Sequence, residues 1–372
     1  MNTVDSDIIA AKIYGEIRSK VYSEKQKLPT LETLAGQYNT SVTTIRNAIA
    51  KLRADGVVYT IRGSGVYVSN TVKPVNKSDL DTIAVIIYFA RRSSSQIGLL
   101  NGITTYLNNK GYKVTLYNNT YTGTGTRSRE TEQVFLEQLY QNPPAGILYY
   151  PVILHETMDC LIKLQLAGIP LVLLDKEASG LNIPSIESDN VNGGFLATMH
   201  LIEKGHRKIA FIASSGIYEA STERDRFAGY CKAMMQNNLE LNTSHIFTES
   251  NHGILLKSDK NKTNRLTEII GRLHKDGVTG IFCINDDLAI QVINIMKSKK
   301  MTVPEDFSIV GFDNLEISEH LDPPLSTIAQ DFNEMGELAA QTVISLIKNK
   351  HASAGRQFVP VNLIERGSVK SI

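Results

Sequence analysis

The hydrophobic positions of this chain follow two different periods along the sequence. Near the start, apolar side chains recur at helical spacing over residues 7–22, 31–35 and 45–52, each marking one face of a helix. Residues 57–61 and 66–68 are rich in β-branched and aromatic residues instead, which is typical of strands. The pattern therefore predicts helices joined by a turn and followed by a two-stranded wing.

The helix predicted around residues 45–52 has clear start and stop signals. Ser41 lies where an N-cap belongs, because its hydroxyl can accept a hydrogen bond from a first-turn N–H group. Asp55-Gly56 then ends the helix. The outward face is polar and cationic, as suits contacts with phosphates and base edges. We therefore expect residues 1–69 to be a winged helix-turn-helix domain that binds double-stranded DNA; the alternative is a winged helix used for protein contacts. The candidate DNA-binding residues are Thr30, Ser41, Thr43, Thr44, Arg46, Asn47, Lys51, Arg62, Gly63 and Ser64.

The same region resembles the GntR winged-helix family. The resemblance is carried by Leu28-Pro29-Thr30, Leu34-Ala35, Ser41 with Thr44-Ile45-Arg46, and Gly63-Ser64-Gly65-Val66-Tyr67-Val68. The family usually has arginines where this chain has Glu32 and Val42, and both often touch DNA. The resemblance thus implies a different operator sequence or a smaller set of contacts here.

Residues 70–81 are polar, contain one proline and lack periodicity, so we interpret them as a linker. From residue 82 to 372 apolar strands alternate with amphipathic helices, and this pattern restarts near residue 191. The predicted strands span 82–89, 113–118, 146–150, 170–174, 208–213, 245–248, 280–284 and 308–311. The predicted helices span 97–110, 128–141, 157–167, 191–204, 224–237, 264–275 and 286–299. Such alternation predicts an α/β fold of two doubly wound parallel subdomains with a ligand cleft between them.

Several fragments of this second region resemble the LacI/GalR effector domain, which has the periplasmic-binding-protein-like fold. They are Asp189-Asn190, Gly193-Gly194, His200-Leu201-Ile202, Gly205–Ala210, Arg224–Tyr230, Asn285-Asp286, Val303–Asp306, Ser308–Asn314, Pro323–Ile328 and Gln330-Asp331-Phe332. The resemblance covers about residues 82–372. A GntR head on a LacI-like body is similar to the arabinose-repressor type of regulator, although this combination alone does not identify the sugar.

Polar residues at predicted strand ends are the candidates for ligand binding, because open α/β sheets bind ligands there. A sugar needs planar polar groups that grip adjacent hydroxyls, together with an aromatic face. The candidate ligand-binding residues are Tyr88, Phe89, Arg91, Asp175, Arg226, Asn285, Asp313 and Gln330. Arg226 is expected to open a helix, and the resemblance implies ligand contacts at Asp175, Arg226, Asn285, Asp313 and Gln330.

Simpler interpretations exist for some of these residues. Asp313 could cap a turn, and Arg226 could form a solvated pair with Glu223. Arg91-Arg92 could bind a phosphorylated sugar or be solvated. Asp286-Asp287 is expected to cap a helix.

Composition and charge indicate the cellular compartment and narrow the possible classes of function. The 372 residues carry a net charge of +1, but residues 1–75 hold ten Lys/Arg against six Asp/Glu, a net charge of +4. Sparse cysteines, a polar N-terminus and the lack of a long apolar segment predict a cytoplasmic protein without membrane spans. No metal-binding or cofactor-binding motif is recognisable, so we expect no cofactor and no enzyme activity.

We therefore expect a transcriptional regulator, a repressor of carbohydrate-utilisation genes, that a small sugar such as L-arabinose or a related sugar controls. We expect it to act as a homodimer that contacts its partner through the first α/β lobe, with the helix at 97–110 as a candidate face. The alternatives from other classes are a sugar-binding transport protein and a sugar-modifying enzyme.

Overall fold

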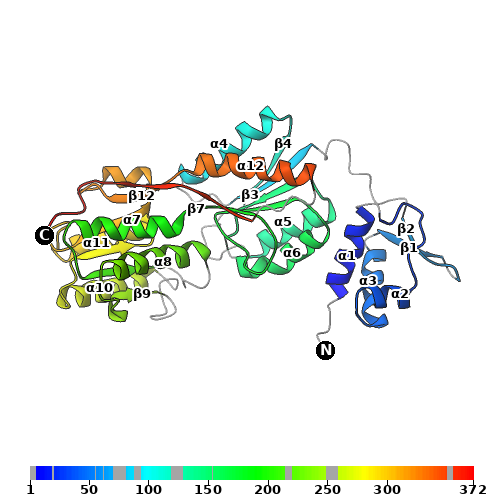
Figure 1. The fold of residues 1–372 in the computed structure, drawn as a ribbon, viewed down its shortest axis with the longest axis horizontal. Coiled ribbons are helices and arrows are strands. Elements are labelled where there is room, and N and C mark those ends of the chain that lie inside the picture. Colours follow the sequence, from blue (N-terminus) through cyan, green and yellow to red (C-terminus); the bar gives the residue numbers. More distant parts are fainter. Residues whose placement is uncertain are drawn as a thin grey trace.

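The computed structural model describes residues 6–18, 21–54, 56–61, 63–69, 81–87, 94–118, 129–152, 154–213, 220–248, 259–349 and 355–372. A small N-terminal head and two α/β lobes follow one another along the long axis of the molecule (Figure 1). Residues 70–80 of the expected linker lie outside the described part of the chain.

The head is a winged helix. Its elements are α1 (Ser6–Arg18), α2 (Leu31–Gln37), α3 (Val42–Ala54), β1 (Val58–Ile61) and β2 (Gly65–Val68). The strands pair antiparallel, from Val58 opposite Val68 to Ile61 opposite Gly65. The Thr44 N–H group donates to the Ser41 hydroxyl over 3.0 Å, which confirms the expected N-cap of α3. The described part of the first helix reaches Arg18, and Val21 and Tyr22, which the prediction included, lie outside a helix.

The N-terminal lobe is built on a parallel sheet with strand order β13-β7-β6-β5-β3-β4. The strands are β3 (Thr82–Ile87), β4 (Lys113–Asn118), β5 (Gly146–Tyr149), β6 (Leu171–Leu174), β7 (Ser185–Ser188) and β13 (Arg356–Val359). Helices α4 (Ser94–Asn109) and α12 (Phe332–Lys348) cover one face, while α5 (Arg129–Gln141) and α6 (Leu154–Leu166) cover the other (Figure 1). Side chains of β3 alternate between these two apolar layers, as strand geometry requires.

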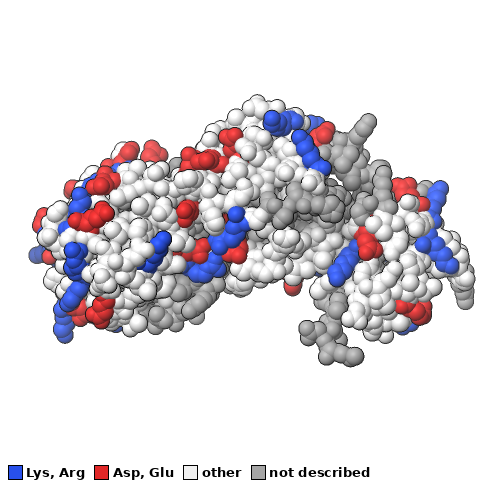
Figure 2. Space-filling model, viewed as in Figure 1, with Lys and Arg blue, Asp and Glu red and all other residues white. Residues whose placement is uncertain are grey.

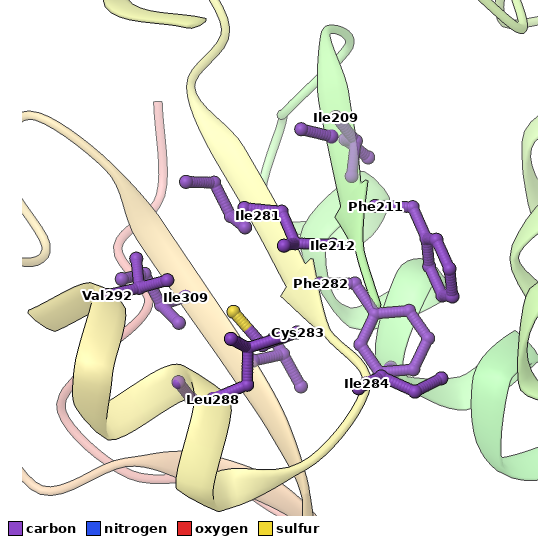
Figure 3. Packing of buried hydrophobic residues seen from close by; sticks show 14 of the residues in the cluster. Ile209, Phe211, Ile212, Ile281, Phe282, Cys283, Ile284, Leu288, Val292 and Ile309 are labelled. Atoms are coloured by element: carbon purple, nitrogen blue, oxygen red, sulfur yellow. The ribbon is translucent and has the colours of Figure 1, made fainter. Parts of the chain in front are cut away.

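The C-terminal lobe has the strand order β14-β12-β11-β10-β8-β9. Its strands are β8 (Ile209–Ile212), β9 (Ile246–Phe247), β10 (Gly280–Cys283), β11 (Ser308–Asp313), β12 (Ser326–Gln330) and β14 (Val361–Ile364). Its helices are α7 (Asn190–Glu203), α8 (Ser221–Gln236), α10 (Asp259–Lys275) and α11 (Asp286–Ser298), with a short 3-10 helix η2 (Glu316–His320). Figure 3 shows how Phe211, Phe282 and Cys283 pack with aliphatic side chains of neighbouring strands and of α11.

The two lobes exchange segments, which the sequence pattern did not predict. The chain passes from one lobe to the other after β7, after β12 and between β13 and β14. Strands β7, β12, β13 and β14 and helix α12 are absent from the sequence prediction. The strands are difficult to recognise because they are short and partly polar, as in the Ser-Ile-Glu-Ser of β7. The two mainly parallel sheets agree with the expected fold class, and one edge departs from parallel pairing, where β14 runs antiparallel to β12.

The head packs directly on the N-terminal lobe, where α1 lies beside α6 (Figure 1). The rings of Tyr14 and Tyr140 have centroids 5.4 Å apart. A Cβ atom on Gly15 would lie 2.4 Å from the Leu166 carbonyl oxygen, so the contact requires glycine at this position. Within the described residues, no helix has both the length and the apolar character that crossing a bilayer demands.

Candidate ligand cleft and nucleic-acid surface

Two carboxylates end parallel strands on opposite lobes. Asp175 directly follows β6 of the N-terminal lobe, and Asp313 is the last residue of β11 in the C-terminal lobe. Their backbone φ angles are 66° and 113°, in the region that side chains other than glycine rarely adopt. Such strain costs about 1–3 kcal/mol per residue and persists mainly at functional sites. Both residues therefore mark the edge where α/β folds bind ligands.

Asp313 lies among polar groups that are themselves largely buried. Its carboxylate accepts from Gln330 Nε2 over 2.6 Å, and Arg226 NH2 lies 3.6 Å away. Burial raises the pKa of the Asp313 carboxyl to about 8, and the nearby charges of Asp286 and Asp175 act in the same direction, against the opposing effect of Arg226. A carboxyl group with this pKa can exchange its proton near neutral pH. Asp313 therefore contacts the side chains of Gln330 and Arg226, which differs from the alternative in which its carboxylate caps a turn.

Arg226 is only 6 % exposed and is fixed from several sides. Its Nε donates to Asn190 Oδ1 over 2.8 Å, its NH1 donates to the Ile284 carbonyl over 2.7 Å, and the guanidinium carbon lies 3.6 Å from the Phe312 ring centroid. The alternative of a solvated pair with Glu223 does not fit a buried guanidinium. The prediction that Arg226 opens its helix was wrong, because α8 begins at Ser221 and Arg226 lies in its second turn.

The N-terminal lobe contributes a tyrosine beside Asp175 that the sequence analysis missed. Tyr150 donates to Asp175 Oδ2 over 2.9 Å, and Lys176 Nζ lies 3.6 Å from the same oxygen. Burial raises the pKa of Tyr150 well above its usual value, and the charges of Asp175 and Asp313 add to this while Arg226 opposes it. Charged groups of both lobes thus act on one phenol, so these strand ends of the two lobes lie near each other. Tyr150 directly follows β5, and the same strand-end rule could have identified it.

The remaining candidates have different roles. Asn285 is the N-cap of α11, where its Oδ1 accepts from the Leu288 N–H group over 2.9 Å. Gln330 Oε1 is buried without a hydrogen-bond partner among the described residues, so it can accept from a ligand hydroxyl. The predicted contacts Tyr88, Phe89 and Arg91 lie outside the described residues.

The head presents most of its candidate DNA contacts on its surface. The exposed residues are Thr30, Ser41, Thr43, Arg46, Asn47, Lys51, Gly63 and Ser64, whereas Thr44 is half-buried and Arg62 lies outside the described residues. Lys51 Nζ donates to Ser6 Oγ over 3.0 Å, which ties it to α1 in this state. Figure 2 shows basic and acidic atoms interspersed over the visible face of the lobes, without a single basic field there.

Known sequences and structures match both parts of the chain. The profile of the family described as bacterial regulatory proteins, gntR family, matches residues 6–68, and that of the periplasmic binding protein-like domain matches residues 198–369. The chain is a transcriptional regulator with a gntR-family head and a periplasmic-binding-protein-like effector domain. Such regulators are not enzymes, and as a family they bind DNA operators and sugar effectors.

Two relatives of this regulator extend over nearly its full length. An arabinose metabolism transcriptional repressor of Geobacillus stearothermophilus is 29% identical over 93% of this chain and 92% of its own length. A second arabinose metabolism transcriptional repressor, from Halalkalibacterium halodurans, is 26% identical over 92% of this chain and 89% of its own. Among solved structures, a periplasmic binding protein/LacI transcriptional regulator from Alkaliphilus metalliredigens, complexed with D-xylulofuranose, covers 78% of this chain and 100% of its own. Its TM-score is 0.59 at 26% identity.

Proposed function

We propose that this regulator is a cytoplasmic repressor of carbohydrate-utilisation genes whose affinity for its operator changes when a small sugar, L-arabinose or a related pentose, binds between the lobes. The observation that carries the proposal is the pair of strained strand-end carboxylates, Asp175 and Asp313, on the two lobes beside the buried Arg226. Carboxylates accept hydrogen bonds from adjacent hydroxyls, and Arg226 NH2, which lies 3.6 Å from Asp313, can donate to a sugar oxygen beside them. The arabinose repressors among the relatives support this choice of sugar.

The cleft also favours an uncharged sugar over a sugar phosphate. The described groups around it include the carboxyl groups of Asp175 and Asp313, the phenol of Tyr150 and two cations, Arg226 and Lys176. Lys176 is already paired with Asp175 and donates to the Pro151 carbonyl. Arg226 already donates to Asn190 and the Ile284 carbonyl, which leaves little capacity to neutralise a dianion. A phosphate here would therefore be opposed by the Asp175 carboxylate, while the nearby cations are already engaged by protein groups.

We further propose that the DNA contacts come from the exposed face of α3 and from the wing. Thr43, Arg46 and Asn47 project from the first two turns of a helix whose opposite face is buried in the head. This is the arrangement in which a recognition helix enters a major groove. Thr30, at the start of α2, and Gly63 and Ser64, in the wing, are suited to phosphate contacts.

A homodimer would hold two such heads on one duplex, and α4 is the candidate face. Within Ser94–Asn109 there is no charged residue, and the exposed positions include Ile97, which is 65 % exposed. Depletion of charge is typical of the buried centre of protein interfaces. The second head then binds at a high effective concentration, which compensates for a small set of contacts per head.

A thermal-shift panel of neutral pentoses, hexoses and sugar phosphates tests the effector, because a ligand that binds only the native state raises the unfolding midpoint. We expect L-arabinose or a related pentose to raise the midpoint of the wild type and to have little effect on an Arg226→Met variant. Fluorescence anisotropy with a duplex selected from random sequence should then show a changed affinity when that sugar is added. A panel in which only sugar phosphates shift the midpoint would contradict the proposed ligand.

A further inference from the structure

A second group of charged residues lies beside the cleft, and its members come from both lobes. We call it the interlobe clasp, and it consists of Glu177, Glu187, Arg224, Asp225 and Arg356. Figure 2 shows basic and acidic atoms side by side where the two lobes meet. Glu177, Glu187 and Arg356 belong to the N-terminal lobe, at or next to β6, β7 and β13, whereas Arg224 and Asp225 belong to α8 of the C-terminal lobe.

Within the N-terminal lobe, Arg356 neutralises a buried carboxylate. Its Nε and NH2 donate to the two oxygens of Glu187, each over 3.0 Å, and the Glu187 side chain has no exposed surface. The Ser185 hydroxyl donates to the same carboxylate over 2.7 Å. A buried charge requires such partners. Because β7 and β13 are neighbouring strands of one sheet, these contacts do not depend on how the lobes are arranged.

A second set of contacts joins the lobes to each other. Arg356 NH2 lies 2.6 Å from Asp225 Oδ2, and Arg224 NH2 lies 3.1 Å from Glu177 Oε2. The Glu177 N–H group also donates to the hydroxyl of Ser221, in the first turn of α8, over 3.0 Å. Movement of α8 away from the N-terminal sheet would break all three contacts.

The clasp connects directly to the ligand cleft. Asp225 precedes Arg226, which approaches Asp313, and Glu177 lies two residues after Asp175. The same turn of α8 thus carries one residue that binds the other lobe and one that faces the cleft. Any change in the separation of the lobes must move Arg226 relative to Asp175.

We propose that the interlobe clasp holds the cleft closed and thereby regulates the sugar site. The clasp sets the affinity for the sugar, and it also sets the arrangement of the lobes to which the DNA-binding heads are attached. This inference rests on the proposed function for the identity of the ligand, but not for the closure itself. A conformational equilibrium responds to a ligand only through its preference for one state. If the cleft opens in a variant without the clasp, closing it costs part of the binding free energy. The apparent affinity then falls in proportion to the fraction of molecules whose cleft is closed.

Hydrogen exchange of the full-length protein tests closure without any ligand, because the Glu177 amide is bonded across the lobes. We expect the Asp225→Ala variant to exchange about tenfold faster in peptides that span residues 175–178, and the Arg224→Gln variant to change in the same direction. The matched control is Lys370→Gln, which breaks the ion pair of Lys370 with Glu305 (2.8 Å) inside the C-terminal lobe and should leave this exchange unchanged. Thermal unfolding monitors whether each variant is folded. Wild-type exchange in both folded clasp variants would overturn the proposal.

Calorimetry with L-arabinose then separates the two proposals. Faster exchange together with about tenfold weaker L-arabinose binding in the clasp variants supports both. Faster exchange in a protein whose wild type binds no sugar of the panel would contradict the proposed function and leave the clasp in place. Faster exchange with unchanged L-arabinose affinity would overturn the inference that the clasp regulates the site.

Discussion

Sugar affinity should rise steeply between pH 6 and pH 8, because the cleft contains a carboxyl group that loses its proton in this interval. Burial raises the pKa of Asp313 to about 8, with Asp286 and Asp175 adding to the rise and Arg226 opposing it. An ionised carboxylate accepts hydroxyl hydrogen bonds that are roughly twice as strong as those of a neutral group. The sugar should therefore prefer the ionised form, and its binding should release a proton below pH 8.

The size of the effect follows from the pKa. A group with a pKa of about 8 is ionised to roughly 1% at pH 6 and about half at pH 8, so affinity can rise by up to about fiftyfold, or roughly 2.3 kcal/mol. The sign for stability is the opposite. The native state binds this proton more tightly than the unfolded chain, so the contribution of Asp313 to the free energy of unfolding falls as pH rises from about 4 to about 8.

The buried histidines of the C-terminal lobe should contribute little in this interval, whereas Asp286, whose pKa burial raises to about 6, titrates at its lower end. Burial lowers the pKa values of His200, His206 and His245 below the usual value, so all three are neutral through most of it. Calorimetry at pH 6, 7 and 8, in two buffers of different ionisation enthalpy, measures both affinity and proton release. The Asp313→Asn variant should bind weakly at every pH, and the surface variant Asp306→Asn should keep the wild-type dependence. A wild-type dissociation constant that changes less than twofold over this range, with no proton release, would refute the reasoning.

Three further predictions concern the head and the assembly. Arg46→Ala should weaken operator binding by roughly 1–3 kcal/mol if the side chain contacts a base. Fluorescence anisotropy measures this, and the control is Lys297→Ala, an exposed position in the effector domain, which should bind the operator as the wild type does. Ile97→Asp should shift the protein toward monomers in analytical ultracentrifugation, because it places a charge in the uncharged face of α4; an unchanged dimer would exclude this face. Gly15→Val should release the head from the N-terminal lobe, since a Cβ there would lie 2.4 Å from the Leu166 carbonyl oxygen; proteolysis between residues 70 and 80 should accelerate, and an unchanged cleavage rate would contradict this.

Local chemistry made the head predictable from the sequence. Ser41 is an N-cap because its hydroxyl accepts a hydrogen bond from a first-turn N–H group, that of Thr44. The two residues are only three positions apart in the sequence. The wing pairs as predicted because β1 and β2 are close in sequence and joined by a glycine-containing tip. Such features depend on neighbours along the chain.

The lobe exchange and the clasp depend instead on contacts between distant residues. Arg356 meets Asp225 across 131 positions of sequence, and β13 pairs with β7 although most of the effector domain lies between them. Neither strand has the long apolar run that marks a buried parallel strand. The strand-end rule found Asp175 and Asp313, but it could not find Asn190, which holds Arg226 from the start of a helix.

Asp286 was expected to cap a helix, and its actual position explains how the strained end of β11 is held. It is fully buried and accepts from the Thr327 hydroxyl over 2.6 Å, the Ser318 hydroxyl over 2.7 Å and the Leu315 N–H group over 2.9 Å. These bonds fix the chain just after Asp313. Burial raises the pKa of Asp286 to about 6, while the three donors oppose the rise.

The helix start, η2 and β12 are therefore tied to one carboxylate directly behind the ligand wall. A residue with φ of 113° persists only where its surroundings allow no relaxation, and this network supplies that constraint. The hydrogen bonds of this network thus hold Asp313 in its strained conformation. The ligand then meets a carboxylate that is already in position.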